Sequence, residues 1–195
     1  MKLKLALVAT ALTMVVSPAV AHKMNHKMTG HKMMHMSNPM VGGAAMYPTK
    51  NIIENAVNSK DHTTLVAAVK AADLVDTLSG AGPFTVFAPT NAAFARLPAG
   101  TVDTLLKPEN KTTLASVLTY HVVAGRVTSG QLVKMIQAGR GKAVLTTVNG
   151  EKLTAKMMGG KVMLVDSKGG MATVTTANVM QSNGVIHVIN RVLLP

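Results

Sequence analysis

The chain contains neither cysteine nor tryptophan, and only five of its 195 residues are aromatic. The absence of Cys excludes disulfides, thiol catalysis and thiolate metal sites. Acidic residues are also few, eight against twenty Lys and Arg, so the formal net charge is +12. Basic charge alone would permit nucleic-acid binding, but so few aromatics argue against stacking on bases. No phosphate loop, nucleophile elbow or paired His-Glu helix motif occurs, so we expect no enzyme and no required cofactor.

Hydrophobic runs of transmembrane length are missing as well. Lys2 and Lys4 precede an apolar run over residues 5–16, which is too short to cross a bilayer comfortably. Ala19-Val20-Ala21 follows as a small-residue cleavage site. Residues 1–21 are therefore predicted to be a signal peptide, the alternative being an N-terminal membrane anchor. The mature protein is expected to be secreted, periplasmic or on the cell surface.

The next segment, residues 22–46, carries four His, three Lys, seven Met and no acidic residue. It has little aliphatic surface to bury, so we predict a disordered tail, with the folded domain spanning residues 47–195. Imidazole binds Cu(II) and a thioether prefers Cu(I), which makes copper the candidate metal. The candidate ligands are His22, Met24, His26, Met28, His31, Met33, Met34, His35 and Met36. An oxidant sink, a cationic contact with envelope polymers and a plain spacer are the alternatives.

The rest of the chain changes from helical to strand periodicity. Apolar spacing predicts helices within residues 49–78, 91–97, 111–118 and 129–136, with an extended segment at 120–123. After Gly141 the pattern alternates with period two, and Asn149-Gly150 is a strong hairpin signal. Residues 185–194 are apolar on both faces and predict a strand buried on two sides. Helices followed by strands indicate an α+β domain.

Three stretches together resemble the motifs of the fasciclin domain family. They are "GPFTVFAPTNAAF" (82–94), "YHVV" (120–123) and "NGVIHVINRVLLP" (183–195), and "TLVAAVKAADLVDTLSG" upstream also matches. The resemblance implies a wedge of two small β-sheets with several helices packed on one side. It further implies an extracellular or membrane-anchored, non-enzymatic protein associated with cell adhesion and matrix contact, with integrins, collagens or surface polysaccharide as partners.

Five residues are candidates for partner binding: Tyr120, His121, Lys152, Lys156 and Asn190. Tyr120 and His121 are either core residues or partner contacts, whereas the neighbouring motif residue His187 is expected to be a hydrogen-bonded core histidine. Asn190 stands where the resemblance leads us to expect Asp, which weakens the case for an integrin-like contact. Antiparallel pairing across Asn149-Gly150 is predicted to bring several basic residues onto one exposed face, out of Lys134, Arg140, Lys142, Lys152, Lys156 and Lys161.

Two functions follow as hypotheses. The first is an exported fasciclin-domain adhesion module with a metal-capable tail. Its partner would be a cell-surface or matrix protein or an anionic polysaccharide. The second is a periplasmic copper-binding or metal-sequestering protein that uses the domain as a scaffold. Induction of the protein by copper would favour the second.

Overall fold

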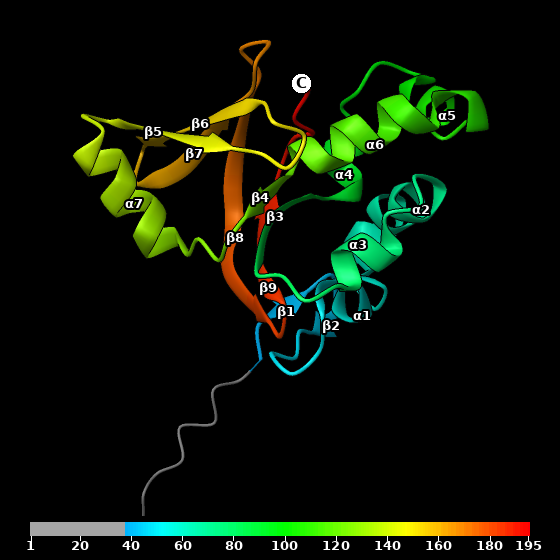
Figure 1. Cartoon of the computed structure of the whole chain (residues 1–195), viewed down its shortest axis with the longest axis horizontal. Helices are drawn as coiled ribbons and strands as arrows, with labels where there is room; N and C mark the ends of the chain where they lie inside the picture. The colour runs from blue at the N-terminus through cyan, green and yellow to red at the C-terminus, as the bar shows by residue number, and fades with distance from the viewer. Residues whose placement is uncertain (1–37) are drawn as a thin grey trace, which may run out of the picture. The chain divides into compact units, whose positions relative to one another are not determined.

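A computed structural model describes residues 38–195 (Figure 1). The predicted signal peptide and the nine candidate copper ligands lie outside the described residues. The helices are α1 (Ile52–Ala56), η1 (Lys60–His62), α2 (Thr63–Ala71), α3 (Val75–Ser79), α4 (Asn91–Phe94), α5 (Thr101–Leu105), η2 (Pro108–Asn110), α6 (Lys111–Tyr120) and α7 (Ser129–Ala138). The strands are β1 (Met40–Val41), β2 (Ala44–Ala45), β3 (Phe84–Pro89), β4 (Val122–Ala124), β5 (Lys142–Thr146), β6 (Lys152–Met158), β7 (Lys161–Val165), β8 (Met171–Gln181) and β9 (Gly184–Ile189).

Seven strands form one curled sheet in the order β4-β3-β9-β8-β7-β6-β5. The long strand β8 joins two halves, because residues 171–173 pair with β7 and the remainder pairs with β9. The two edges of the sheet approach each other, where Val123 bridges Thr147 and the Val148 N–H donates to the Val122 carbonyl at 2.7 Å. The predicted small sheets are therefore two halves of a continuous one, and the α+β class is confirmed.

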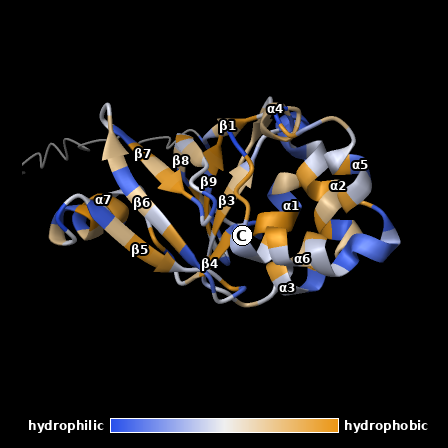
Figure 2. Ribbon diagram, turned by 90° about the horizontal axis from the view of Figure 1, so that it is seen from above, coloured by the Kyte–Doolittle hydropathy of each residue, from blue (hydrophilic) through white to orange (hydrophobic). Residues whose placement is uncertain are grey.

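The curled sheet separates two hydrophobic cores. Figure 2 shows apolar residues on the strands of the sheet and on the helices beside it. Helices α1 to α6 supply one core against β3, β4 and β9. The other core lies inside the curl, where α7 contributes Leu132 and Ile136. Ile186 and Val188 of β9 enter the first core, and Ile189 enters the second. The prediction of a strand buried on both faces over residues 185–194 is confirmed for residues 185–189, whereas the strand ends at Ile189 and Arg191 is exposed.

Asn183 fixes the turn that leads into β9. Its side-chain amide donates to the carbonyls of Leu78 and Gly80 at 2.8 and 2.9 Å, and its oxygen accepts from the Ile52 N–H at 3.0 Å. One side chain therefore holds the end of α3 and the start of α1. The next residue is Gly184, where a Cβ would lie 2.2 Å from the Phe84 carbonyl oxygen. The Asn-Gly pair thus serves long-range packing as well as the turn.

The domain begins earlier in the chain than the sequence predicts. Strands β1 and β2 form a hairpin, and Val41 and Met46 are 8% and 2% exposed. The Lys60 N–H donates to the Gly42 carbonyl at 3.1 Å, which ties the hairpin to η1. Residues 39–46 therefore belong to the folded domain, and the predicted boundary at Tyr47 is wrong. The reason is packing: Val41 and Met46 are buried by residues far along the chain, which local periodicity cannot reveal.

The predicted extended segment at 120–123 is also corrected in its first half. Helix α6 continues through Tyr120, His121 is its C-cap, and β4 begins at Val122. The spacing of Leu114, Val117, Leu118 and His121 is i, i+3, i+4, i+7, so the buried face of the helix extends to His121. Helical packing overrides the strand preference of the aromatic and β-branched residues.

Candidate interaction surface

The outward side of strands β5 to β8 gathers basic and apolar side chains. On β6, Lys152 and Lys156 are exposed while Leu153 and Ala155 are fully buried, because successive strand residues point to opposite faces. The same alternation holds on β5, on β7 and over residues 171–174 of β8. We call this surface the outer sheet face, and its members are Lys142, Val144, Thr146, Lys152, Thr154, Lys156, Met158, Lys161, Met163, Val165, Met171 and Thr173.

The strand register places two lysines side by side. Lys142 lies directly opposite Lys156, and Lys161 lies opposite Met158 in the next pair of strands. Like charges in cross-strand positions destabilise a sheet slightly, so this arrangement costs stability when no anion is present. The ammonium group of Lys152 donates to Thr146 Oγ1 at 2.8 Å, which holds it over the same face.

The predicted basic cluster is confirmed for four of its six members. Lys134 and Arg140 are exposed, but they belong to the region of α7, which packs against the inner side of these strands through Leu132 and Ile136. Helix geometry therefore removes them from the outer sheet face. Sequence reasoning missed the exposed apolar members, Val144, Met158 and Met171, which are 53%, 55% and 49% exposed. Residues at even spacing from the exposed lysines along a strand lie on the same face, and this alternation is the sequence signal that could have identified them.

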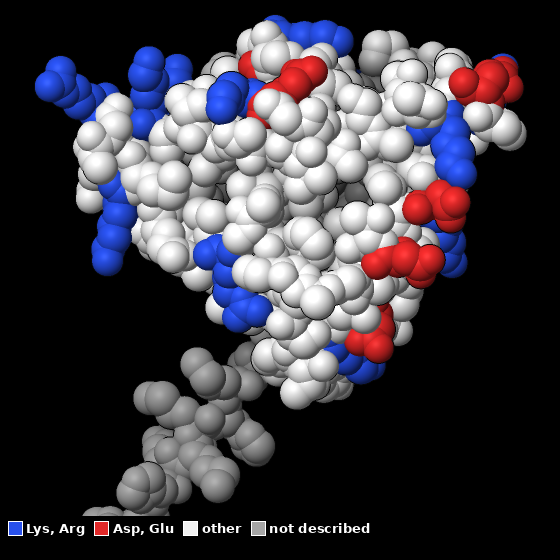
Figure 3. Space-filling view, viewed as in Figure 1, with Lys and Arg blue, Asp and Glu red and all other residues white. Residues whose placement is uncertain are grey.

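Charge is distributed unevenly along the chain. Residues 110–195 contain ten of the twenty Lys and Arg but only two of the eight acidic residues. Of these two, Glu151 lies in the hairpin turn, and Asp166 is buried, accepting from the Lys168, Gly170 and Leu194 N–H groups. Figure 3 shows blue side chains over α7 and the β5–β7 region, with most red side chains over the helices.

Tyr120 is enclosed in the core inside the curl, with no exposed surface. Its hydroxyl donates to the Lys152 carbonyl at 2.9 Å and accepts from the Ser167 N–H at 3.1 Å. Burial raises the pKa of Tyr120 above its usual value. The residue therefore cannot contact a partner directly, and this part of the predicted binding set is wrong. Its hydroxyl instead positions the start of β6, which carries Lys152.

His121 is also buried, at 2% exposure, and both ring nitrogens are engaged. Nδ1 lies 2.7 Å from the Val117 carbonyl oxygen, and Nε2 accepts from the Leu193 N–H at 2.9 Å. These partners assign the proton to Nδ1, because a carbonyl only accepts and an N–H only donates. Burial lowers the pKa of His121 to about 4, so the ring is neutral near pH 7. Its predicted role as a partner contact is wrong for the same reason as for Tyr120.

His187 and Asn190 lie on and just after β9. His187 is fully buried, with Nε2 2.8 Å from the Val127 carbonyl oxygen, and it stacks on Phe87 at 5.6 Å, as expected of a hydrogen-bonded core histidine. Asn190 is partly exposed, and its side-chain oxygen accepts from the Thr173 N–H at 2.8 Å. An Asp oxygen could accept the same bond, so Asn in place of Asp preserves this link between β8 and β9. A partner contact by Asn190 stays a prediction.

Two further kinds of feature are relevant in the described residues, a cluster of metal ligands and a membrane-spanning helix. Within residues 38–195, no group of three His, Cys, Asp or Glu side chains is placed to hold a metal ion. Over the same range, none of the helices is long and apolar enough to cross a bilayer.

Comparison with known proteins agrees with this architecture. The model of the Fasciclin domain matches residues 60–195. "Protein sll1483" of Synechocystis sp. is 53% identical over 156 residues, which cover 80% of this chain and 79% of that protein. "Immunogenic protein MPB70" of Mycobacterium bovis is 39% identical over 145 residues, covering 72% of this chain and 66% of the relative. These matches define a fasciclin-class α+β domain.

The chain belongs to the fasciclin domain family. Its fold is also similar to a solved FAS1 domain pair from the insect cell adhesion molecule Fasciclin I, with a TM-score of 0.66 and 20% identity. That match covers 75% of this chain and 51% of the other, so it concerns the fold of one domain. The fasciclin wedge predicted from the three sequence motifs is confirmed.

Proposed function

We propose that this protein is an exported, non-catalytic adhesion module whose outer sheet face binds an anionic polymer of a cell surface or matrix. The observation that carries the proposal is the row of four lysines on this face with no acidic side chain among them. Membership of the fasciclin family supports it, as does the similarity of the fold to a molecule described as a cell adhesion molecule.

Electrostatic attraction explains why such a face would prefer a polyanion. An anionic group placed between Lys142 and Lys156 relieves their mutual repulsion while it gains attraction from both. The exposed side chains of Val144, Met158 and Met171 add apolar contact beside the charges. Interactions between exposed charges are screened over about 8 Å at physiological salt, so binding should weaken steeply as salt increases.

A salt series with charge-reversed variants tests this proposal. The probe is an immobilised sulfated or carboxylated polysaccharide, compared with an uncharged one. Changing Lys152 and Lys156 together to Glu should weaken binding at low salt by at least tenfold. The matched control reverses two exposed lysines of the helical region, Lys60 and Lys107, and should change binding much less. Equal losses in both variants would show a general effect of net charge and refute a specific face. Binding that is insensitive to salt would favour a shaped protein contact instead.

Export and copper binding form the second part of the proposal. Residues 1–21 act as a signal peptide, and the tail that follows binds copper through His22, His26, His31 and His35 together with its methionines. The composition of the segment supports this, since four His and five Met lie between residues 22 and 36. Met40 and Met46 do not belong to this tail, because residues 39–46 are part of the folded domain.

Copper titration with a four-histidine variant tests the tail. Replacing these four His with Ala should remove most Cu(II) affinity while part of the Cu(I) affinity remains on Met. Full Cu(II) affinity in the variant would place the metal elsewhere and refute the assignment.

A further inference from the structure

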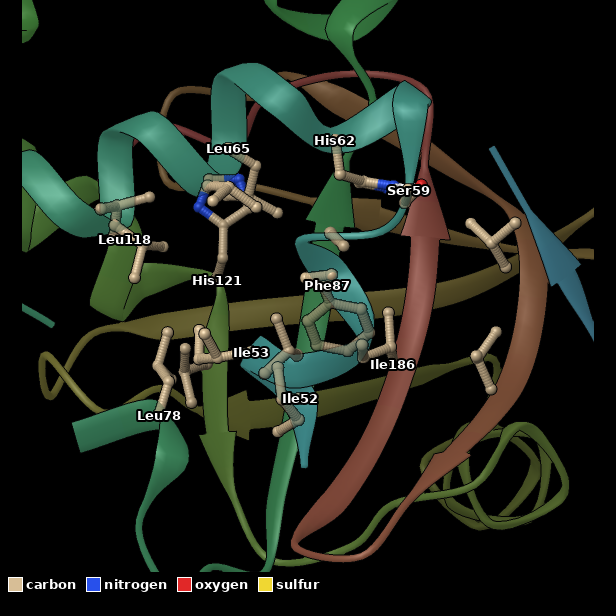
Figure 4. A pocket seen from close by; sticks show the side chains of 18 of the residues that line it. Ile52, Ile53, Ser59, His62, Leu65, Leu78, Phe87, Leu118, His121 and Ile186 are labelled. Carbon is tan, nitrogen blue, oxygen red and sulfur yellow. Dashed lines mark hydrogen bonds between the residues drawn. The ribbon is translucent and has the colours of Figure 1, made fainter. Parts of the chain in front are cut away.

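A cavity of about 50 Å³ lies in the core between the sheet and the helices. Its inner walls come from α1, α2 and α6 and from strands β3, β4 and β9, whose side chains converge on it in Figure 4. The buried side chains of Ile52, Leu65, Leu118 and Ile186 form much of this wall. The cavity is thus assembled from segments separated by more than a hundred residues.

The wall of the cavity is too apolar to hold water. The lining side chains Ser59 and His62 bond to each other at 2.8 Å, and both nitrogens of His121 bond to the backbone. Among the buried side-chain nitrogen and oxygen atoms of residues 38–195, only His62 Nε2 lacks a hydrogen-bond partner. Burial lowers the pKa of His62, and the nearby Ala88 backbone counteracts part of this shift. A buried water needs two to four polar partners, which this wall does not supply.

The volume is large for an empty space in a native core. A water-sized group needs about 10–15 Å³ on this measure, so the cavity has room for roughly four groups of methylene size. Native interiors contain few voids larger than one water molecule, because each removes dispersion contacts from its lining. An apolar occupant of several carbon atoms would restore those contacts.

The cavity also has a mouth and a closed end. The half-exposed residues Ile53, Ala56, Val66 and Val75 line it from α1, α2 and α3, which places the mouth between these helices. Lys70 is the one exposed residue of the lining and its only cation. Val41 and Met46 of the β1–β2 hairpin close another side.

We propose that this cavity binds the alkyl chain of a small amphiphile, with an anionic end group meeting Lys70 at the mouth. The chemistry of the wall selects a chain of methylene groups, and the single cation selects the sign of the end group. This inference does not depend on the adhesive role of the outer sheet face, because the cavity lies in the other core.

Two probes of equal chain length test the proposal on the full chain, 1-octanol and octanoate, each used below its aggregation concentration. About four carbons at the end of each chain would fill the cavity, and the remaining carbons would extend through the mouth toward Lys70. Methyl NMR should show saturable shifts at Ile53, Val66 and Leu118, with little change at Leu153 and Leu164 in the core inside the curl. Octanoate should bind more tightly than octanol, and Lys70→Met should remove the difference while keeping the apolar stem. Equal affinity of the two probes for the unmodified protein would overturn the role given to Lys70.

Substitutions at the mouth provide the matched controls. Ala56→Phe and, independently, Val66→Phe place a ring at the half-exposed rim and should weaken octanol binding at least tenfold. Ala67→Phe adds the same ring on the exposed side of α2, outside the lining, and should leave affinity unchanged. No saturable methyl shifts in the unmodified protein, or shifts spread evenly over both cores, would overturn the proposal. Equal affinity in the rim and control variants would do the same.

Discussion

The β1–β2 hairpin provides a sharp test of where the domain begins, because it carries two methionines in opposite environments. Met46 is 2% exposed and packs in the core beneath the helices, whereas Met40, in the same hairpin, is 63% exposed. Removing a buried Met side chain costs about 2–5 kcal/mol, through lost burial and the void that remains. Met46 borders the existing cavity, so its removal enlarges a space that already lacks contacts. We expect Met46→Ala to lower the free energy of unfolding by about 3 kcal/mol.

Met40→Ala is the matched control for this change. It removes the same atoms from the same hairpin at an exposed position, where substitutions usually change stability by less than about 0.5 kcal/mol. Urea denaturation of the full chain and of both variants measures the difference, with an unchanged m-value as the check on two-state unfolding. If both variants lose less than about 0.5 kcal/mol, the hairpin does not stabilise the domain. The domain would then begin at Tyr47, as the sequence alone predicts.

Three further predictions concern the buried motif residues and the basic face. Since His121 has a pKa of about 4 in the fold and about 6.5 when unfolded, the unfolded chain binds its proton first, and stability should fall by about 3 kcal/mol between pH 6.5 and 4. Denaturation at a series of pH values measures this, and a flat profile would contradict it. Tyr120→Phe should lower the free energy of unfolding by about 1–2 kcal/mol, because the Ser167 N–H and the Lys152 carbonyl each lose a hydrogen-bond partner. Unchanged stability would refute these two hydrogen bonds. In a pull-down on a polyanion, Lys152→Met should weaken binding without changing the melting temperature, since this side chain is exposed; a lower melting temperature would give it a structural role instead.

Much of the sheet could be predicted because its signals are local. Asn149-Gly150 fixes the β5–β6 turn, and period-two alternation then decides which lysines share a face. The pairing of Lys142 with Lys156 does not follow from this signal, because a two-residue Asn-Gly turn would pair Lys142 with Met157, whereas the structure pairs Thr146 with Lys152 and Lys142 with Lys156. Closeness in sequence alone would place Lys134 on the same face, but the helical geometry of α7 removes it from that face. The position of a turn can be read from the sequence, whereas the exact register of its strands and the side of a sheet on which a helix packs cannot.

The hairpin at residues 40–45 and the cavity could not be predicted for a different reason. Each strand of the hairpin has two residues, which is too short for any periodicity to appear. Its position depends on Gly42, where a Cβ would lie 2.3 Å from Ser59 Oγ, so the constraint comes from the tertiary contact itself. The cavity likewise requires Val41 and Ile186 to face one space. Such features depend on residues brought together only by the complete fold.

The Tyr-His pair at the end of α6 explains how the two halves of this molecule are joined. Tyr120 points into the core inside the curl and bonds to β6, while the next residue, His121, lines the cavity under the helices. Adjacent residues can face opposite cores here because the helix ends between them and β4 begins directly afterward. His121 also accepts from the Leu193 N–H, which fixes the C-terminal segment against the same junction. The Tyr-His pair therefore connects the strand that carries Lys152 to the core that holds the cavity. Substitutions of Tyr120 or His121 should therefore affect both the outer sheet face and the cavity by destabilising the fold, and not by removing a direct contact with a ligand.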